Sequence, residues 1–285
     1  MNMILAIIVT YNGEKYIADC LDSLQKQTQK VDILVVDNAS SDHTCSIIKN
    51  EYSTVKVIDI GYNSGFAHAN NVGMQHAMEN GYEYVLLINE DTVSDNRLVE
   101  NLLKYADRQT AVAPKIYMNG SMTKVWYGAG KMDFENGLAI NCQKELVDIV
   151  SEVSFMTGCC MLIHTDILRK VGLFDEKFFM YYEDTDLSLR MYENNIKMMY
   201  NPNACLWHRM QGRTKKDYYM YYMERNRLLF LRKHAKTFRC SVLKVIVQEL
   251  QKIVIKPDVV SFAFSKYKLK GLFDFIRNKT GVMES

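Results

Sequence analysis

The chain has 285 residues, of which 48% are hydrophobic, 24% are charged and 11% are aromatic. These values are typical of a globular protein, and the length allows one large α/β domain with an appendage. Three prolines and fourteen glycines exclude a collagen-like segment or a disordered linker. No apolar run approaches the ~18 residues of a membrane-spanning helix. The run at residues 4–9 is too short for a signal-peptide core and lacks a basic flank.

The cysteines and the charges point to a compartment and to a kind of partner. Seven cysteines, an odd number without a C-x-x-C pair, argue against a disulfide framework or a structural zinc site and favour a reducing cytosol. The net charge of +2 conceals an asymmetry: residues 1–208 carry 17 Lys and Arg against 27 Asp and Glu, whereas residues 209–285 carry 18 against 6. A basic C-terminal quarter predicts contact with an anionic partner such as phospholipid, polyphosphate or nucleic acid.

The N-terminal third of the chain alternates between apolar strands and helix-like segments. We predict, in chain order, a strand at residues 4–12, a helix at 14–28, a strand at 32–40, a helix at about 42–51, a strand at 55–60, a helix ending near residue 80 and a strand at 82–91. This order is typical of a mostly parallel sheet with helices on both faces. The near-continuous apolar strands indicate that both faces of the sheet are covered.

The pattern is less regular beyond residue 110. We expect, in order, a strand at 111–117, an antiparallel excursion at 126–150, a strand at 153–164, a helix that turns at Gly172, an acidic-headed helix at 181–195, a short strand at 204–207, and helices at 216–235 and over much of 241–277. The last two helices carry aromatic and basic residues and make up the basic quarter of the chain.

Polar side chains cluster where the predicted parallel strands end. The residues concerned are Thr10, Tyr11, Asn12, Asp37, Asn38, Asn63, Asn89, Glu90 and Asp91. Ligands of parallel α/β sheets bind outside the carboxyl ends of the strands, where these side chains are expected to converge. Neither a G-x-G-x-x-G sequence after the first strand nor a P-loop sequence occurs, which argues against a dinucleotide oxidoreductase or a P-loop enzyme.

The first two clusters suggest a nucleotide site. The ring of Tyr11 can stack on a nucleobase, and Asp37 can accept a hydrogen bond from the imide N–H of the base. The competing interpretation is an ordinary loop tyrosine and a helix-capping aspartate, and these residues alone favour it. Asn89 and Asp91 offer the oxygen ligands that Mg²⁺ or Mn²⁺ prefers, completed by phosphate oxygens and water. A solvated turn would explain the same residues.

A second acidic group opens the predicted helix at residues 181–195. The N-terminus of a helix stabilises negative charge, so capping alone explains Glu183, Asp184 and Asp186. The functional interpretation is a general base, for which Asp184, flanked by Glu183, is the best candidate. His208 is a further candidate metal ligand, although a lone histidine beside a tryptophan is more often a packing residue.

Seven blocks occur in a characteristic order: VTYN, VVDNASSD, NSGFAHANNVG, LLINEDT, MTGCCMLI, YYEDTDLSLR and WHRMQG. The order resembles that of the family 2 inverting glycosyltransferases of GT-A fold, above all the bacterial rhamnosyltransferase-type members, and covers residues 3–235. The resemblance implies an α/β, Rossmann-like GT-A domain at residues 1–210 that binds a nucleotide sugar and catalyses its transfer. A helical basic region at residues 211–285 would follow, in contact with a membrane or a partner.

The resemblance also implies roles for individual residues. Those matching the donor-binding segments are Thr10, Tyr11, Asn12, Asp37, Asn63, Gly65, Phe66, Asn70 and Asn89. The first three would lie along the nucleoside, and Asp37 would recognise uracil or thymine. The group from Asn63 to Asn70 would pass under the nucleotide sugar.

The resemblance places the metal and the base as well. Asn89 and Asp91 match the ends of the family's D-x-D motif, so Asp91 would hold Mg²⁺ or Mn²⁺ and His208 would complete the site. Asp184 matches the catalytic base, with Glu183 beside it in a supporting position. Asn89 departs from the first aspartate of the motif, which weakens metal binding there. Glu90 stands where proline is common, and the sequence leaves its role open.

The implied reaction is attack by an acceptor hydroxyl on the anomeric carbon of a nucleoside-diphosphate sugar, with inversion. The subgroup favours dTDP-L-rhamnose as donor, while UDP-galactose, UDP-galactofuranose and UDP-GlcNAc stay open. The acceptor would be a glycan or a lipid-diphosphate-linked glycan of a cell-surface polysaccharide. We expect a cytoplasmic protein on the inner face of the plasma membrane.

Other functions use the same fold. A non-catalytic nucleotide-sugar-binding subunit is conceivable, but Asp91 and Asp184 argue against it. Nucleotidyl transfer onto a sugar phosphate would need a Gly-rich, basic loop after the first strand, and TYNGEKYI is not one. Residues 218–234 fit either a packed helix with one basic face or a surface helix on an anionic membrane. Nucleic acid is disfavoured as a partner because no recognition motif accompanies the charge.

Overall fold

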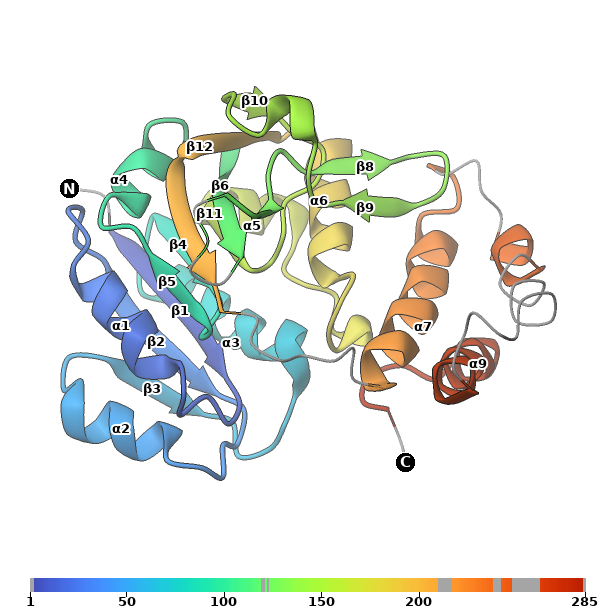
Figure 1. Ribbon diagram of the computed structural model, residues 1–285, viewed down its shortest axis with the longest axis horizontal. Helices are drawn as coiled ribbons and strands as arrows, with labels where there is room; N and C mark the ends of the chain where they lie inside the picture. The colour runs from blue at the N-terminus through green and yellow to red at the C-terminus, as the bar shows by residue number, and fades with distance from the viewer. Residues whose placement is uncertain are drawn as a thin grey trace.

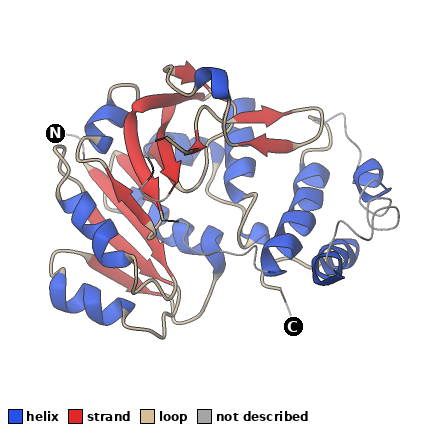
Figure 2. Cartoon of the chain, viewed as in Figure 1, coloured by secondary structure: helices blue, strands red, loops and turns tan. Residues whose placement is uncertain are grey.

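The protein is described here by a computed structural model that covers residues 3–118, 121, 123–209, 217–237, 242–247 and 262–283. Its centre is a large mixed sheet flanked by helices (Figures 1 and 2). The strands are β1 (Ile4–Thr10), β2 (Asp32–Asp37), β3 (Lys56–Asp59), β4 (Tyr84–Ile88), β5 (Thr92–Ser94), β6 (Thr110–Met118), β7 (Val125–Tyr127), β8 (Lys131–Asp133), β9 (Leu138–Ile140), β10 (Ser151–Glu152), β11 (Cys160–His164) and β12 (Lys197–His208).

The helices alternate with the strands in the first part of the chain and dominate the last part. They are α1 (Ile17–Gln25), α2 (Thr44–Glu51), α3 (Gly65–Glu79), α4 (Leu98–Leu103), α5 (Thr165–Val171), α6 (Glu183–Glu193), α7 (Asp217–Lys233) and α9 (Phe262–Ile276), with 3₁₀ helices η1 (Lys144–Leu146) and η2 (Glu176–Phe178). The described helices include none that is both long enough and apolar enough to cross a bilayer.

Along the sheet the strands run β10-β12-β6-β11-β4-β1-β2-β3, while β5 pairs with β12 and β7 with β6. The four strands from β3 to β4 are parallel, as predicted, and β6 and β12 are also parallel to each other. Between the two parallel groups β11 is antiparallel to both neighbours. The α/β, mostly parallel class is thus confirmed, and the antiparallel excursion at residues 126–150 contains the β8–β9 hairpin.

Burial explains why these apolar runs form strands. The residues of β4 are all buried, as are nearly all those of β1 and β2, because side chains on both faces of the sheet are covered. The register pairs Thr10 with Asp37, so β1 and β2 end side by side. The polar residues that follow the strands therefore meet at one edge, as the sequence predicts.

Two expected strands differ from the prediction. Residues 153–164 were expected to form one strand, but β11 begins only at Cys160. The backbone N–H groups of Met156 and Gly158 donate instead to side chains of α6, namely Ser188 and Asp184. Since these two amides bond to a helix, they cannot take part in a strand ladder. The short strand expected at 204–207 is the end of the much longer β12, which contains His208.

The C-terminal helices pack against the rest of the protein. The helix expected at residues 216–235 is confirmed as α7, and α9 lies beside it (Figure 1). An apolar cluster joins Leu228 and Phe230 of α7 to Phe178, Tyr182 and Leu189 from the segment around α6. Of the expected helix at 241–277, residues 242–247 and 262–276 are helical, and the part between them lies outside the described residues. The domain boundary proposed at residue 210 also lies outside them.

Candidate active site

The turn after β1 is tied to the turn after β4. Glu90 accepts hydrogen bonds through Oε2 from the hydroxyl of Thr10 and from the backbone N–H of Tyr11, at 3.3 Å in the second case. Thr10 is fully buried, whereas the ring of Tyr11 is 48% exposed. Glu90, whose role the sequence leaves open, therefore fixes the turn that presents the Tyr11 ring. That ring is free to stack on a flat ligand, and its contact with a nucleoside stays a prediction.

The turn after β2 is held by the turn after β1. The backbone N–H of Asn12 donates to Ser40 Oγ at 2.9 Å, and Asn12 Oδ1 accepts from the N–H of Ser41 at 2.8 Å. Asp37 is 1% exposed and accepts from the N–H of Ser40 at 3.0 Å and from its hydroxyl at 2.5 Å. Each carboxylate oxygen has a second lone-pair direction, so a further N–H donor can still be accepted. Base recognition by Asp37 stays a prediction.

Asn38 connects this edge to the start of α3. Its Nδ2 donates to the carbonyl of Gly65 at 3.1 Å, while its Oδ1 accepts from the N–H and hydroxyl of Ser64 at 3.1 and 2.7 Å. Asn63 Oδ1 accepts from the N–H of Gly65 at 3.1 Å. The sequence marked Asn38 only as one of several polar strand-end residues, because its partners lie 26 and 27 positions further along the chain.

Gly65 is required by both its backbone and its surroundings. Its φ is 86°, and a Cβ there would lie 2.4 Å from Cδ2 of Phe179. We expect Gly65→Ala to lower the free energy of unfolding by about 2–5 kcal/mol, since left-handed alanine costs ~1–2 kcal/mol and overpacking ~1–3 kcal/mol. Gly61→Ala is the matched control, because Gly61 has φ 79° and no heavy atom within 4 Å of a built Cβ. Urea unfolding of both variants measures the difference. Equal losses of unfolding free energy in the two variants would contradict a steric clash between the added Cβ at position 65 and Phe179.

The predicted residues of α3 use their side chains differently. Asn70 is 2% exposed, and its Nδ2 donates to the carbonyl of Phe66 at 2.9 Å within the helix. The ring of Phe66 lies against Gly158, where a Cβ would come within 3.2 Å of Phe66 Cε1 and 3.4 Å of Asp184 Cβ. Gly158 therefore brings the predicted donor segment next to the predicted base. The sequence predicted only that this residue lies within the strand expected at 153–164.

Asp91 and His208 meet where β5 pairs with β12. Residue 92 is the register partner of His208, and Nε2 of His208 lies 3.0 Å from Oδ1 of Asp91. Both side chains are at most 6% exposed, and Oδ1 of Asn89, two positions before Asp91 in the chain, is buried without a hydrogen-bond partner. A carboxylate paired with an imidazole, and an unpaired oxygen in the same turn, fit a divalent metal that takes its other ligands from phosphate and water.

The protein supplies too few ligands to complete such a metal site by itself. Within the described ranges no group of three His, Cys, Asp or Glu side chains could hold a metal ion. Burial lowers the pKa of His208, but Cys159 and Asp91 oppose it and raise the pKa to about 10. Of these two influences we consider Asp91 decisive, because burial raises the pKa of the Cys159 thiol and keeps it neutral. Without a metal the two groups therefore form an ion pair, and metal binding at Nε2 would displace the proton.

Asp184 is held at the first turn of α6. Its Oδ2 accepts from the N–H of Gly158 at 2.9 Å, and its Oδ1 accepts from the N–H and hydroxyl of Thr185 at 2.7 and 3.2 Å. Burial raises the pKa of Asp184, and these hydrogen bonds partly offset it. Asp184 as a residue is half-buried, so a hydroxyl ligand can approach it. A fixed, half-buried carboxylate with a raised pKa has the properties of a general base.

Glu183 beside it has a different environment. It is 4% exposed, and its Oε2 is buried without a hydrogen-bond partner. Burial and the neighbouring charge of Asp184 raise the pKa of Glu183 well above its usual range. When the two carboxyls share one proton, Glu183 holds it and Asp184 carries the charge, because Gly158 and Thr185 donate to both oxygens of Asp184 whereas Oε2 of Glu183 has no partner.

Comparison with known proteins identifies the family. Residues 5–172 match the family Glycosyl transferase family 2. The chain belongs to this family. Similar proteins include the dTDP-rhamnosyl transferase RfbF of Shigella flexneri, 25% identical over 98% of this chain and 97% of that protein. The N-acetylglucosaminyl-diphospho-decaprenol L-rhamnosyltransferase of Mycobacterium tuberculosis (strain ATCC 25618 / H37Rv) is 26% identical over 74% of this chain and 77% of that protein.

Solved structures support the GT-A glycosyltransferase fold. GalNAc-T7 with UDP, GalNAc and Mn²⁺ superposes with a TM-score of 0.67 at 15% identity, covering 97% of this chain and 56% of that chain. The mannosyltransferase PcManGT from Pyrobaculum calidifontis, in complex with GDP-Man and Mn²⁺, gives 0.64 at 14% identity, covering 97% and 87%. The family and the fold expected from the sequence are therefore confirmed.

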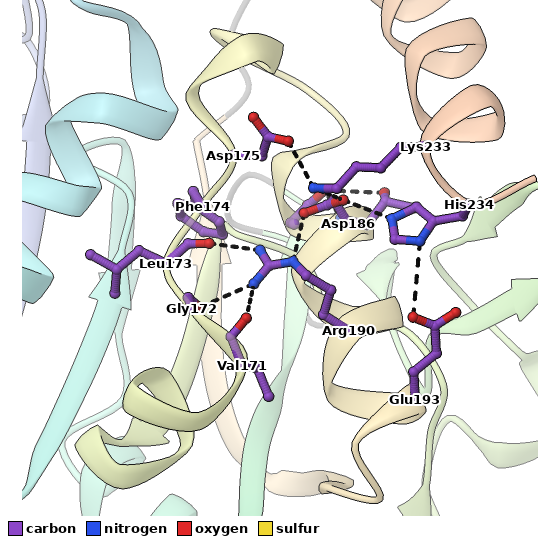
Figure 3. Close-up of polar contacts among 12 residues, drawn as sticks. Val171, Gly172, Leu173, Phe174, Asp175, Asp186, Arg190, Glu193, Lys233 and His234 are labelled. Carbon is purple, nitrogen blue, oxygen red and sulfur yellow. Dashed lines mark hydrogen bonds and ion pairs between the residues drawn. The ribbon is translucent and has the colours of Figure 1, made fainter.

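The third acid of the group has a structural role in this family 2 glycosyltransferase. Asp186 is fully buried and accepts from Arg190 Nε at 2.8 Å, while Lys233 Nζ and His234 Nε2 lie 2.7 and 2.8 Å from its Oδ1 (Figure 3). Burial opposes ionisation, but these donors lower the pKa of Asp186 to about 2. Arg190 in turn donates to the carbonyls of Gly172 and Leu173 at 3.1 and 2.7 Å. Asp186 thus joins α6 to the end of α7.

Proposed function

We propose that this glycosyltransferase moves L-rhamnose from dTDP-L-rhamnose, with inversion, to a hydroxyl group of a glycan or a lipid-diphosphate-linked glycan. The observation that carries the proposal is the contact at Gly158, which sets the predicted donor segment around Phe66 beside the carboxylate of Asp184. A sugar lying along that segment would have its anomeric carbon within reach of a hydroxyl bound to Asp184. The rhamnosyltransferase names of the relatives support the choice of sugar.

The residues support direct displacement. Asp184 takes the proton from the acceptor hydroxyl as the hydroxyl oxygen bonds to the anomeric carbon, and the nucleoside diphosphate leaves from the opposite face of the sugar. One base and one displacement give inversion of configuration. Gly158 and Thr185 donate to both oxygens of Asp184, which stabilises its ionised form and fixes its orientation. A divalent metal bound by Asp91 and His208 would neutralise charge on the departing diphosphate.

Exposed groups of α9 support an acceptor at a membrane. Phe273 and Ile276 are 56% and 58% exposed, and Lys266 and Arg277 are exposed on the same helix or just beyond it. Apolar and basic side chains side by side favour the interface of an anionic bilayer. A lipid-diphosphate-linked acceptor on the cytoplasmic face would be presented at such a surface.

The test is calorimetric titration of the full chain with dTDP-L-rhamnose, UDP-galactose, UDP-galactofuranose and UDP-GlcNAc, each with and without Mn²⁺ or Mg²⁺. We expect dTDP-L-rhamnose to bind most tightly and only with metal. Asp91→Asn should abolish the effect of metal, whereas the exposed control Glu152→Gln should retain it. Tighter binding of a UDP-sugar would overturn the donor, and metal-independent binding would overturn the role of Asp91. Binding without transfer to any acceptor glycan would favour a non-catalytic subunit.

A further inference from the structure

The loop that leads into Asp184 has an unusual backbone. Phe179, Tyr181 and Tyr182 have φ values of 63°, 65° and 74°, in the left-handed region. None of the three is glycine, and bulky residues rarely adopt this conformation because Cβ crowds the backbone. Such a conformation persists only when the surrounding structure holds it, and it is concentrated at functional sites.

Asn226 of α7 holds this loop. It is fully buried, and its Nδ2 donates to the carbonyls of Phe178, Met180 and Tyr181, at 2.8 Å in each case. An amide has two N–H groups, so one of them is shared between two carbonyls. One side chain thereby bonds to three carbonyls of a five-residue loop. In a helix or a strand, backbone N–H groups would bond to these carbonyls instead.

Arg225 sets the orientation of that amide. Its Nε donates to Asn226 Oδ1 at 2.9 Å, so Nδ2 faces the loop. The guanidinium is fully buried, donates through Nη2 to Phe178 at 3.1 Å and through Nη1 to Gly281 at 2.6 Å, and lies over the ring of Tyr222. A buried cation that is bonded on several sides is rigid, and it keeps Asn226 in place.

The loop touches both halves of the predicted site. The carbonyl of Phe179 accepts from the N–H of Ala67 in α3 at 3.1 Å, and the ring of Phe179 lies against Gly65. At the other end the carbonyl of Tyr182 accepts from the N–H of Asp186 at 2.8 Å and starts α6. A change in the loop would therefore move the base away from its place beside the donor segment.

We propose that Asn226 is a positioning residue for the transfer reaction. Its amide, oriented by Arg225, holds the loop at residues 178–182, with its three positive-φ residues, in the conformation that orients Asp184. The inference rests on the proposed role of Asp184 as the base. The basic C-terminal region would then contribute to catalysis, because α7 supplies the side chain that holds the loop before Asp184. A purely structural Asn226 would affect stability alone, and the experiment has to separate these two outcomes.

The experiment compares Asn226→Ala with Asn101→Ala. Asn101 is also a buried amide, donating to the carbonyl of Asn203 at 2.7 Å, but it lies in α4 on the opposite side of the molecule from α7 (Figure 1). At a temperature where both variants are folded, we expect Asn226→Ala to lower kcat by about a hundredfold, with the Kd for the donor unchanged. Asn101→Ala should keep the wild-type kcat although it also loses stability.

A double-mutant cycle shows whether Asn226 acts through Asp184. In an Asp184→Asn background, Asn226→Ala should cause no further loss of kcat, because the group it aims is already absent. The proposal would be overturned if the fold-losses of kcat in the two single variants multiplied in the double variant. It would also be overturned if Asn226→Ala kept the wild-type kcat, as Asn101→Ala should. Wild-type activity of Asp184→Asn alone would instead overturn the base itself, and with it the inference.

Folding is checked separately with Asn226→Asp, which keeps the volume of the side chain but removes its N–H donors. We expect it to fold and to lose kcat as Asn226→Ala does. Unfolding of both Asn226 variants would assign the residue to stability alone and so overturn the proposal.

Discussion

Asp184→Asn is expected to lower kcat by roughly 10²–10⁴-fold, because an amide cannot accept the proton of the acceptor hydroxyl. The Kd for the donor should not change, since the amide keeps the size of the carboxyl and its oxygen can still accept from Gly158. Steady-state kinetics at saturating donor, together with calorimetry, measures the two quantities. Asp107→Asn, which alters an exposed turn carboxylate, serves as the control and should keep the wild-type kcat.

The pH profile of the wild type gives a second expectation for the same residue. Burial raises the pKa of Asp184, so kcat should begin to fall at a higher pH than for an exposed aspartate as protonation removes the base. Asp184→Asn should lack this acidic limb. An unchanged limb in the variant, or equal rates of transfer in both proteins, would remove Asp184 from its assigned role.

Asp186→Asn is expected to have the largest effect on stability. The carboxylate is buried against Arg190, Lys233 and His234. Its neutralisation removes the counter-charge of the largely buried Arg190 and one of the two carboxylates that Lys233 contacts. We expect the free energy of unfolding to fall by about 3–5 kcal/mol, which is typical when one partner of a buried ion pair is removed. Urea denaturation at neutral pH measures the loss.

Glu100→Gln is the matched control for Asp186→Asn. Hydrogen bonds from Arg97 and Thr28 lower the pKa of Glu100 to about 2, as for Asp186, but Glu100 lies at the surface. Surface ion pairs contribute little to stability, so the urea midpoint should not change. Equal losses in the two variants would show that burial of the Asp186 cluster is not what makes it stabilising.

Acid unfolding checks the same cluster independently. The pKa of Asp186 falls from its ordinary 3.8 to about 2 in the folded protein, so its contribution is complete above the ordinary value and is lost as the pH falls toward about 2. By linkage this contribution amounts to ~2–3 kcal/mol. The free energy of unfolding of Asp186→Asn should therefore decrease less steeply than that of the wild type over this range. Parallel curves would contradict the assignment.

The sequence predicted those features that depend on local patterns. Apolar runs followed by polar residues located the ends of β1, β2 and β4, and the parallel arrangement then placed Thr10, Asp37 and Asp91 at one edge. Such predictions succeed because burial on two faces requires continuous apolar strands. The donor and metal roles of these residues stay predictions.

Features that depend on distant partners could not be predicted in this way. Asp184 and Asp186 look alike at the start of a helix, yet the first bonds to Gly158 and the second to His234, 26 and 48 positions away. Likewise the apolar segment before Cys160 has the composition of a strand but donates its N–H groups to α6. Arg225 belongs to a basic and aromatic pattern typical of a surface helix and is fully buried.

The loop at residues 178–182 limits how this protein can be recombined with its relatives. The residues that keep its left-handed backbone in place come from α7, some 45–48 positions later. A chimera that joined residues 1–209 of this protein to the C-terminal helices of a relative would separate the loop from the Asn226 amide that bonds to it. We therefore expect such a chimera to keep its activity only if the loop and α7 are taken from the same protein.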